Sequence, residues 1–164
     1  SEKLFELMDF DEKRLRSFLK TIEIDDYFAE FIKLCGEKNY DIYIVSDGFD
    51  FNIDTVLRKY EIKDLEIYSN SFYFDDHGKY YLKFPHESQS CGKCGTCKTE
   101  IYNSLRQDCD EIIYIGDGYS DKCVAAKADV LFAKNYLAEY CNEKGINYKP
   151  YSSFKDVMEY VREL

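Results

Sequence analysis

Apolar residues return every three or four positions through the segment 1–35. In its first part these residues are Leu4, Leu7, Met8, Leu15, Phe18 and Leu19, set among charged residues. In its second part, from about 25 to 35, they are Phe28, Phe31 and Ile32. This spacing places them on one face of a helix and predicts two amphipathic helices, the second with Gly36 as its C-cap.

Short apolar runs of strand length come next along the chain. They lie at 41–46, 65–70, 111–117 and 130–134. Helical segments are expected between most of them and at the end of the chain, at 51–60, 98–107, 120–128 and 154–164. Near-continuous apolar strands that alternate with helices are typical of the α/β class, and they predict a doubly wound parallel sheet.

One segment, 71–84, breaks this alternation. Its aromatic residues recur with a period of two around Asp76-His77-Gly78, which predicts a β-hairpin inserted into the α/β frame. A cysteine-rich stretch follows the hairpin directly. We find no repeat, low-complexity tract or linker, so we expect one compact core over 25–164 that carries the hairpin and the cysteine-rich loop at 71–97 as an insertion.

Composition narrows the classes of partner. The formal net charge of −10 argues against a nucleic-acid or anionic-membrane surface, which needs a basic face, whereas a small phosphate responds to the local field of its pocket. No run approaches the length of a bilayer span, and no short apolar stretch with a basic flank opens the chain, so we expect a cytoplasmic protein. The odd number of cysteines, seven, favours reduced thiols over a disulfide framework.

Ligands of a parallel sheet bind beyond the carboxyl ends of its strands. The predicted strand at 111–116 is followed by Asp117, Gly118, Ser120 and Asp121. We expect Gly118 to allow a tight turn and Ser120 to cap the next helix, so that Asp117 and Asp121 face one point and bind a hard cation such as Mg²⁺. The alternative is that Asp117 caps the turn and Asp121 balances the helix dipole.

Two further positions could meet a phosphate. The predicted strand at 41–46 ends in Ser46-Asp47-Gly48, where a hydroxyl and turn amides can hold phosphate oxygens, although this tripeptide is also a common turn. Lys98 opens a predicted helix and could neutralise a phosphate, although a surface lysine is the simpler interpretation.

The chain order of these residues carries more weight than any one of them. Ser46, Lys98, Asp117 and Asp121 together resemble the second, third and fourth motifs of the haloacid dehalogenase superfamily. The resemblance implies a Rossmann-like fold in which Ser46 binds the transferring phosphoryl group and Lys98 offsets its charge. It also implies that Asp117 ligates Mg²⁺ and that Asp121 supports the metal or its waters.

Two longer passages narrow the resemblance. The segments 84–98 and 130–154 are similar to the phosphoserine-phosphatase-like branch, and most of all to the methionine-salvage phosphatases that act on a methylthiopentenyl phosphate ester. The order of a histidine, three cysteines and a lysine also recurs in the phosphocholine and phosphoethanolamine phosphatases of that branch.

The superfamily's first motif is an apolar strand ending in Asp-x-Asp-Gly-Thr, whose first Asp is the nucleophile. Here Asp9-Phe10-Asp11 follows a helical pattern and precedes Glu12, so we expect Asp9 or Asp11 to be a helix N-cap. Matched to the family, 1–24 is the remnant of a helical cap. We therefore expect the chain to be a fragment of a longer phosphatase. The nucleophile strand, expected between the strands at 41–46 and 111–116, would belong to a missing N-terminal segment. That segment would then be a binding partner of this chain.

The cysteine-rich loop offers ligands for a second metal. Cys91, Cys94 and Cys97, with His86 five residues upstream of Cys91, are the ligand types of a closed tetrahedral zinc site. Such a site would sit beside Lys98 and stiffen the loop that aims it. A reduced or disulfide-prone loop is the alternative.

The resemblance implies an Mg²⁺-dependent phosphomonoester phosphatase, a hydrolase that acts on a small phosphorylated metabolite through an aspartyl-phosphate. One alternative is a catalytically inactive phosphate- and metal-binding fragment or regulatory protein. Another is a partner-docking zinc module made of the hairpin and the cysteines. Because the cap sets specificity in this superfamily, methionine-salvage, phosphoserine-like and phosphocholine-like substrates all stay open.

Overall fold

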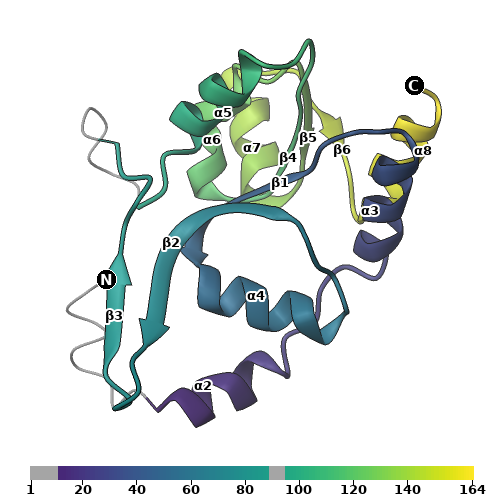
Figure 1. Ribbon diagram of the computed structural model, residues 1–164. Coiled ribbons are helices and arrows are strands. Elements are labelled where there is room, and N and C mark those ends of the chain that lie inside the picture. The colour runs from purple at the N-terminus through teal and green to yellow at the C-terminus, as the bar shows by residue number, and fades with distance from the viewer. Residues whose placement is uncertain (1–10, 89–94) are drawn as a thin grey trace.

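The strands of the computed structural model form two sheets within the described residues, 11–88 and 95–164 (Figure 1). The first sheet has the order β1 (Tyr43–Phe49), β2 (Glu66–Phe74), β3 (Tyr80–Lys83). The second has the order β4 (Ile113–Gly116), β5 (Val130–Ala133), β6 (Lys149–Pro150). All neighbouring strands are parallel except β2 and β3, which form the antiparallel hairpin.

Helices separate most of the strands, as the apolar pattern predicts. They are α2 (Glu12–Leu19), α3 (Phe28–Glu37), α4 (Asp50–Lys59), α5 (Lys98–Arg106), α6 (Lys122–Ala125), α7 (Asn135–Lys144) and α8 (Phe154–Arg162). A 3₁₀ turn, η1 (Tyr119–Asp121), precedes α6. The α/β class is therefore confirmed. Within the described part of the chain, no helix combines the length and apolar composition needed to cross a bilayer.

The two predicted caps near the start of the chain have different outcomes. Asp11 is the N-cap of α2, where its carboxylate accepts a hydrogen bond from the Lys13 amide at 2.9 Å; Asp9 lies outside the described residues. The prediction for Gly36 is wrong, because this residue lies inside α3. The left-handed turn behind that helix is made by Asn39 at φ 58°, a conformation that asparagine tolerates, so no glycine is needed there.

The first arm of the hairpin continues a strand of the sheet. The run expected at 65–70 and the first arm of the hairpin are one strand, β2, which pairs with β1 in its first half and with β3 in its second. Polar residues in its middle stay in the strand because they have partners: the Asn70 amide donates to the Asp47 carbonyl at 2.7 Å, and the Ser71 hydroxyl donates to Asp50 at 3.0 Å. The turn that joins β2 to β3 contains Gly78 at φ 77°, a left-handed conformation that suits glycine.

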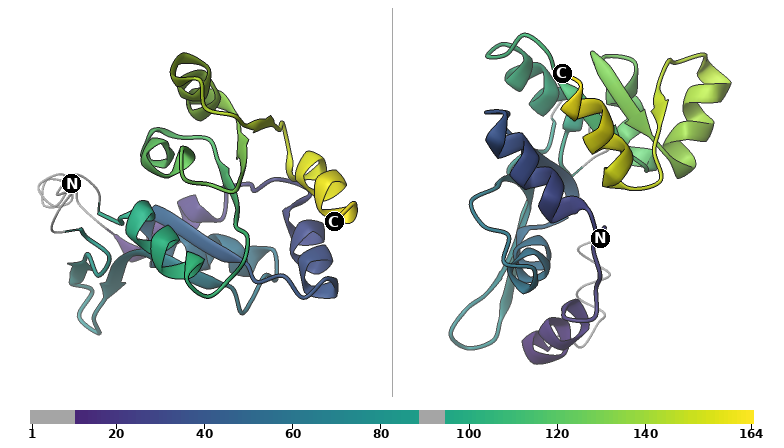
Figure 2. Two further views of the ribbon diagram at one scale, coloured as in Figure 1. Left: turned by 90° about the horizontal axis from the view of Figure 1, so that it is seen from above. Right: turned by 90° about the vertical axis from the view of Figure 1, so that its right-hand side faces the viewer.

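The second sheet is covered on both faces by helices. Along β5, Phe132 points to one face while Leu131 and Ala133 point to the other, as the period of a strand requires. The cluster around Phe132 includes residues of α3 and α8, which lie side by side in Figure 2. The cluster around Leu131 includes residues of α6 and α7. Among the described cysteines, all of which are free, one is buried in each of these clusters, Cys35 and Cys141.

The strands β1 and β4 belong to different sheets and do not pair with each other in the described residues. This is what we expect if a further strand lies between them, as in the superfamily's topology. That strand, and the N-terminal segment expected to supply it, stay predictions.

Candidate functional site

Ser46, Asp47 and Gly48 lie in a bulge inside β1. Val45 pairs with Tyr68 and Phe49 pairs with Asn70, so four steps along β1 oppose two along β2. The expected strand end at Ser46 is therefore wrong: the strand resumes at Phe49, whose ring packs 5.9 Å from that of Phe72. The bulge takes the backbone of the three residues out of the regular ladder, and the Ser46 hydroxyl accepts a hydrogen bond from the Gly48 amide at 3.0 Å.

The side chain and the backbone carbonyl of Asp47 both accept hydrogen bonds from other parts of the protein. Its carboxylate accepts a hydrogen bond from the Thr96 amide at 3.1 Å, and its carbonyl accepts one from Asn70 at 2.7 Å. The Thr96 hydroxyl donates to the Asn70 side chain at 3.3 Å, and both residues are buried, at 0% and 3% exposure. Because a carboxylate repels a phosphate, any phosphate contact of Asp47 has to come from its backbone amide.

The loop after β4 folds back on itself. Asp121 is buried, and its Oδ2 accepts hydrogen bonds from the Asp117 amide at 3.1 Å and the Gly118 amide at 2.9 Å. A side chain at Gly116 would place its Cβ 2.8 Å from Cγ of Asp121, so this close approach requires glycine. The predicted cap at Ser120 is wrong, because Ser120 lies within η1 and Asp121 itself is the N-cap residue of α6.

The other oxygen of Asp121 receives two side chains. Lys98, the first residue of α5, places its ammonium 2.7 Å from Oδ1, and the Tyr114 hydroxyl donates to the same oxygen at 2.6 Å. The side chains of Lys98 and Asp121 are 12% and 6% exposed. Burial alone would raise the pKa of Asp121, but the charge of Lys98 and the hydrogen bonds of Lys98, Tyr114 and Gly118 outweigh it, so the pKa is lowered.

The segment 95–98 joins the two sheets at this point. Thr96 is hydrogen-bonded to Asp47 in β1, and Lys98, two residues later, is bonded to Asp121 behind β4. The charges of Asp121 and Asp47 both act to raise the pKa of Tyr114, after burial, which is the largest cause. The serine bulge, the lysine and the acidic loop are therefore drawn together from β1, α5 and the end of β4.

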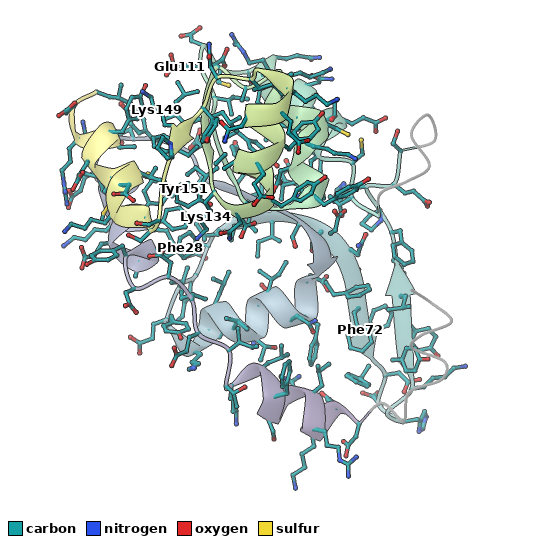
Figure 3. All side chains as sticks on the ribbon, turned by 180° about the vertical axis from the view of Figure 1, so that it is seen from behind. Phe28, Phe72, Glu111, Lys134, Lys149 and Tyr151 are labelled. Atoms are coloured by element: carbon teal, nitrogen blue, oxygen red, sulfur yellow. The ribbon has the colours of Figure 1, made fainter. Side chains whose placement is uncertain are left out.

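A second tyrosine supports the loop. The Tyr151 hydroxyl donates to the Gly116 carbonyl at 3.3 Å, and the Lys134 ammonium lies 4.9 Å from the centre of the Tyr151 ring (Figure 3). Burial, followed by the charges of Asp117 and Asp121, raises the pKa of Tyr151, so its hydroxyl stays protonated at neutral pH.

Asp117 and Asp121 differ in what they can bind. Asp117 is exposed, and its carboxylate has no hydrogen bond within the described residues, so it can serve as an oxygen ligand of Mg²⁺. The Asp121 carboxylate already accepts four hydrogen bonds, which fill the lone-pair sites of its two oxygens. No group of three metal-binding side chains occurs in 11–88 and 95–164, so the Asp117 carboxylate is not part of a complete ligand set within these residues.

The residues predicted to hold zinc are described only in part. Cys97 is buried at the N-cap of α5, and its amide donates to the His86 carbonyl at 2.8 Å. Both residues line a cavity of about 270 Å³. Cys91 and Cys94 lie outside the described residues, so the zinc site stays a prediction.

Three residues of the site were missed from sequence. Tyr114 sits in an apolar run and resembles a core residue, so no local signal marks its hydroxyl. Asn70 and Thr96 do leave a trace, because Asn70 is a polar residue within a predicted strand and Thr96 stands two positions before Lys98. Their joint role at Asp47 depends on contacts between distant segments.

Comparison with known proteins identifies the family of the chain. Residues 3–152 match a family described as Putative Phosphatase. A protein of Bacillus mycoides (strain KBAB4) named 2-hydroxy-3-keto-5-methylthiopentenyl-1-phosphate phosphatase is 34% identical over 148 residues, 88% of this chain and 66% of its own length. A protein of the same name from Bacillus thuringiensis (strain Al Hakam) is 32% identical over 98% of this chain and 74% of its own length. The chain thus spans about two thirds to three quarters of these relatives.

Solved structures show the same fold at low sequence identity. Phosphoserine phosphatase from T. onnurineus superposes with a TM-score of 0.66 at 17% identity, covering 99% of this chain and 71% of that one. A phosphoserine phosphohydrolase-like protein from Francisella tularensis subsp. tularensis SCHU S4 superposes with a TM-score of 0.68 at 17% identity, covering 97% and 74%.

Proposed function

Since this chain belongs to the putative phosphatase family, in the phosphoserine-phosphatase-like branch of the haloacid dehalogenase superfamily, we propose that its site serves the Mg²⁺-dependent hydrolysis of a small phosphate monoester. The reaction proceeds through an aspartyl-phosphate, and catalysis rests on positioning and charge neutralisation.

The buried Lys98–Asp121 ion pair is the observation that supports this function most strongly. An ammonium has three N–H donors, and within the described residues Asp121 is the one hydrogen-bond acceptor of Lys98. Because the Lys98 side chain is only 12% exposed, its other donors gain most from an anionic acceptor inside the site. A transferring phosphoryl group is such an acceptor, and its negative charge is the charge that an ammonium offsets.

Ser46 provides a neutral donor to the same group. The Ser46 oxygen accepts a hydrogen bond from the Gly48 amide, while the hydroxyl hydrogen has no acceptor in the described part of the chain. That hydrogen is available to a phosphate oxygen. The bulge thus holds Ser46 in a fixed orientation, and its neighbour Asp47 keeps the bulge attached to the lysine segment through Thr96.

Asp117 is the carboxylate that holds Mg²⁺ in this proposal. When bound there, the ion would supply positive charge to offset that of the phosphoryl oxygens. Asp121 acts indirectly. Its Oδ2 accepts a hydrogen bond from the Asp117 amide, and this bond fixes the backbone position from which the Asp117 side chain extends. This refines the expectation that Asp121 supports the metal.

The nucleophilic aspartate in this proposal is inferred from the first motif of the superfamily. None of the described residues is an aspartate at the end of a strand between β1 and β4, and Asp11 caps α2. That observation favours a second candidate function, a protein that binds phosphate and a divalent cation without hydrolysing an ester. The two functions differ in turnover and agree in their ligand.

The substrate proposed first is the methylthiopentenyl phosphate ester in the names of the Bacillus relatives. Phosphoserine is the second compound to test, and phosphocholine the third. All three compounds carry a compact organic group on a phosphate. The phosphate is the part that Ser46, Lys98 and Asp117 are proposed to recognise.

Phosphate release from these three esters, with and without Mg²⁺, tests the proposal. We expect turnover in the protein that carries the superfamily's nucleophilic aspartate, and we expect it to require Mg²⁺. Lys98→Ala should lower this turnover by at least about a hundred-fold, with Lys79→Ala on the exposed hairpin turn as the matched control. Lys98-dependent binding of inorganic phosphate without turnover would support the binding function instead. Turnover that is equal in Lys98→Ala and wild type would contradict both.

A further inference from the structure

We propose that Tyr114 is a positioning residue for the site, acting through Asp121 to fix the ammonium of Lys98. The inference rests on the proposed phosphatase function, which it deepens. It assigns a role to a hydroxyl that lies inside a strand rather than at a strand end.

The two oxygens of the Asp121 carboxylate have different hydrogen-bond partners. The amides of Asp117 and Gly118 hold Oδ2, while Lys98 and Tyr114 share Oδ1 at 2.7 and 2.6 Å. Both bonds to Oδ1 are short, as expected for bonds to an ionised acceptor. The two amides alone leave the carboxylate free to rock about Oδ2, and the Tyr114 hydroxyl removes this freedom.

The Tyr114 ring gives its hydroxyl a defined position. The ring packs against the cluster formed by residues of α6, β5 and α7, including Ala125 and Leu131. Within the described residues its hydroxyl has one hydrogen-bond partner, Asp121. Burial and the Asp121 charge raise the Tyr114 pKa, so the hydroxyl remains a donor at every pH at which the protein would work.

Lys98 depends on this arrangement because its own stem is flexible. Four methylene groups join its ammonium to the backbone, so the buried acceptor, rather than the stem, decides where the charge lies. When the hydroxyl is lost, Oδ1 keeps the ammonium as its only side-chain partner and the pair can shift together. A displacement of about 1 Å of a catalytic group can lower a rate by about a hundred-fold.

The test compares Tyr114→Phe with Tyr102→Phe. Tyr102 is a matched control because it is buried, lies on the same helix as Lys98, and donates to the Lys127 carbonyl at 3.0 Å, away from Asp121. We expect Tyr114→Phe to lower kcat by about ten- to a hundred-fold with KM nearly unchanged. Tyr102→Phe should keep kcat. Equal kcat in Tyr114→Phe and wild type would overturn the proposal.

A second readout does not depend on turnover. We expect acetylation of Lys98 by a neutral N-hydroxysuccinimide ester, followed by mass spectrometry, to be faster in Tyr114→Phe than in wild type and unchanged in Tyr102→Phe. If no variant hydrolyses any ester, this labelling still decides whether Tyr114 positions Lys98, so the two proposals fail separately. Unchanged labelling in Tyr114→Phe contradicts the positioning role.

A double-variant cycle separates positioning from a loss of packing. In an Asp121→Asn background the ionised acceptor is absent, so adding Tyr114→Phe should leave the Lys98 labelling rate as it is. If Tyr114→Phe instead accelerates labelling by the same factor in both backgrounds, Tyr114 acts through the core and the proposal is wrong.

Discussion

The ammonium nitrogen of Lys98 and Oδ1 of Asp121 lie 2.7 Å apart, although 23 positions separate the two residues in the chain. The pair connects α5 to the loop behind β4. Its burial makes it sensitive to the loss of either member, because the remaining charge would be left without its partner.

Replacing Lys98 by Met removes the charge and keeps the length of the side chain. We expect ester hydrolysis to fall by about a hundred- to a thousand-fold, the effect typical of losing one charge-stabilising donor. We also expect the free energy of unfolding to fall by about 3 kcal/mol, since Asp121 keeps its charge in a buried place. Phosphate release and urea unfolding measure the two effects, and Lys79→Met, at an exposed position, should change neither.

The lowered pKa of Asp121 predicts a loss of stability in acid. A carboxyl group whose folded pKa lies below its unfolded value of about 3.9 binds protons more readily in the unfolded chain. Its contribution is therefore complete above that value and is lost as the pH falls through the folded pKa. Urea unfolding between about pH 6 and pH 3 should show a steeper loss for wild type than for Asp121→Asn. Parallel curves would contradict the assignment.

Gly116→Ala tests the close approach of the loop behind β4. The new Cβ would stand 2.8 Å from Cγ of Asp121, so the carboxylate has to move away from its two amide donors. We expect a loss of about 1–3 kcal/mol in stability together with a lower kcat. Gly36→Ala is the control: nothing lies within 4 Å of its Cβ and it is inside α3, so it should stabilise the protein by up to about 1 kcal/mol.

Asn70→Ala tests the link between the two halves of the site. It leaves the Asp47 carbonyl and the Thr96 hydroxyl without their buried partner. We expect the free energy of unfolding to fall by about 1–3 kcal/mol. Asn142→Ala, which removes an exposed hydrogen bond from the Tyr148 hydroxyl, should lower the free energy of unfolding far less. Equal effects in the two variants would show that Asn70 has no special role at the bulge.

The zinc hypothesis predicts one zinc ion per chain in protein purified without a chelator. Elemental analysis should find it in wild type and in Cys109→Ser, whose thiol is exposed and lies outside the cluster. Cys97→Ser should lose it, because four ligands are needed to close a tetrahedral site. Wild-type protein without zinc would favour the alternative of a reduced or disulfide-prone loop.

Local patterns in the sequence determined the fold class and the choice of site residues. The alternation of apolar strands and amphipathic helices depends on the periods of the two structures, which are visible within about ten residues. Lys98 at the start of α5, and Asp117 directly behind β4, follow from those boundaries. The order of Ser46, Lys98, Asp117 and Asp121 then indicated the superfamily, and the family comparison confirmed it.

Only the tertiary structure decided how these side chains are used. The bulge at Ser46, the continuity of β2 and the engagement of Asp47 by Thr96 all depend on partners in other segments. Asp121 was expected to face a cation beside Asp117, but its four hydrogen bonds come from Lys98, Tyr114 and two amides of its own loop. A hydrogen bond between residues far apart in sequence leaves no periodic signal, because it depends on how the elements pack and not on the residues beside it.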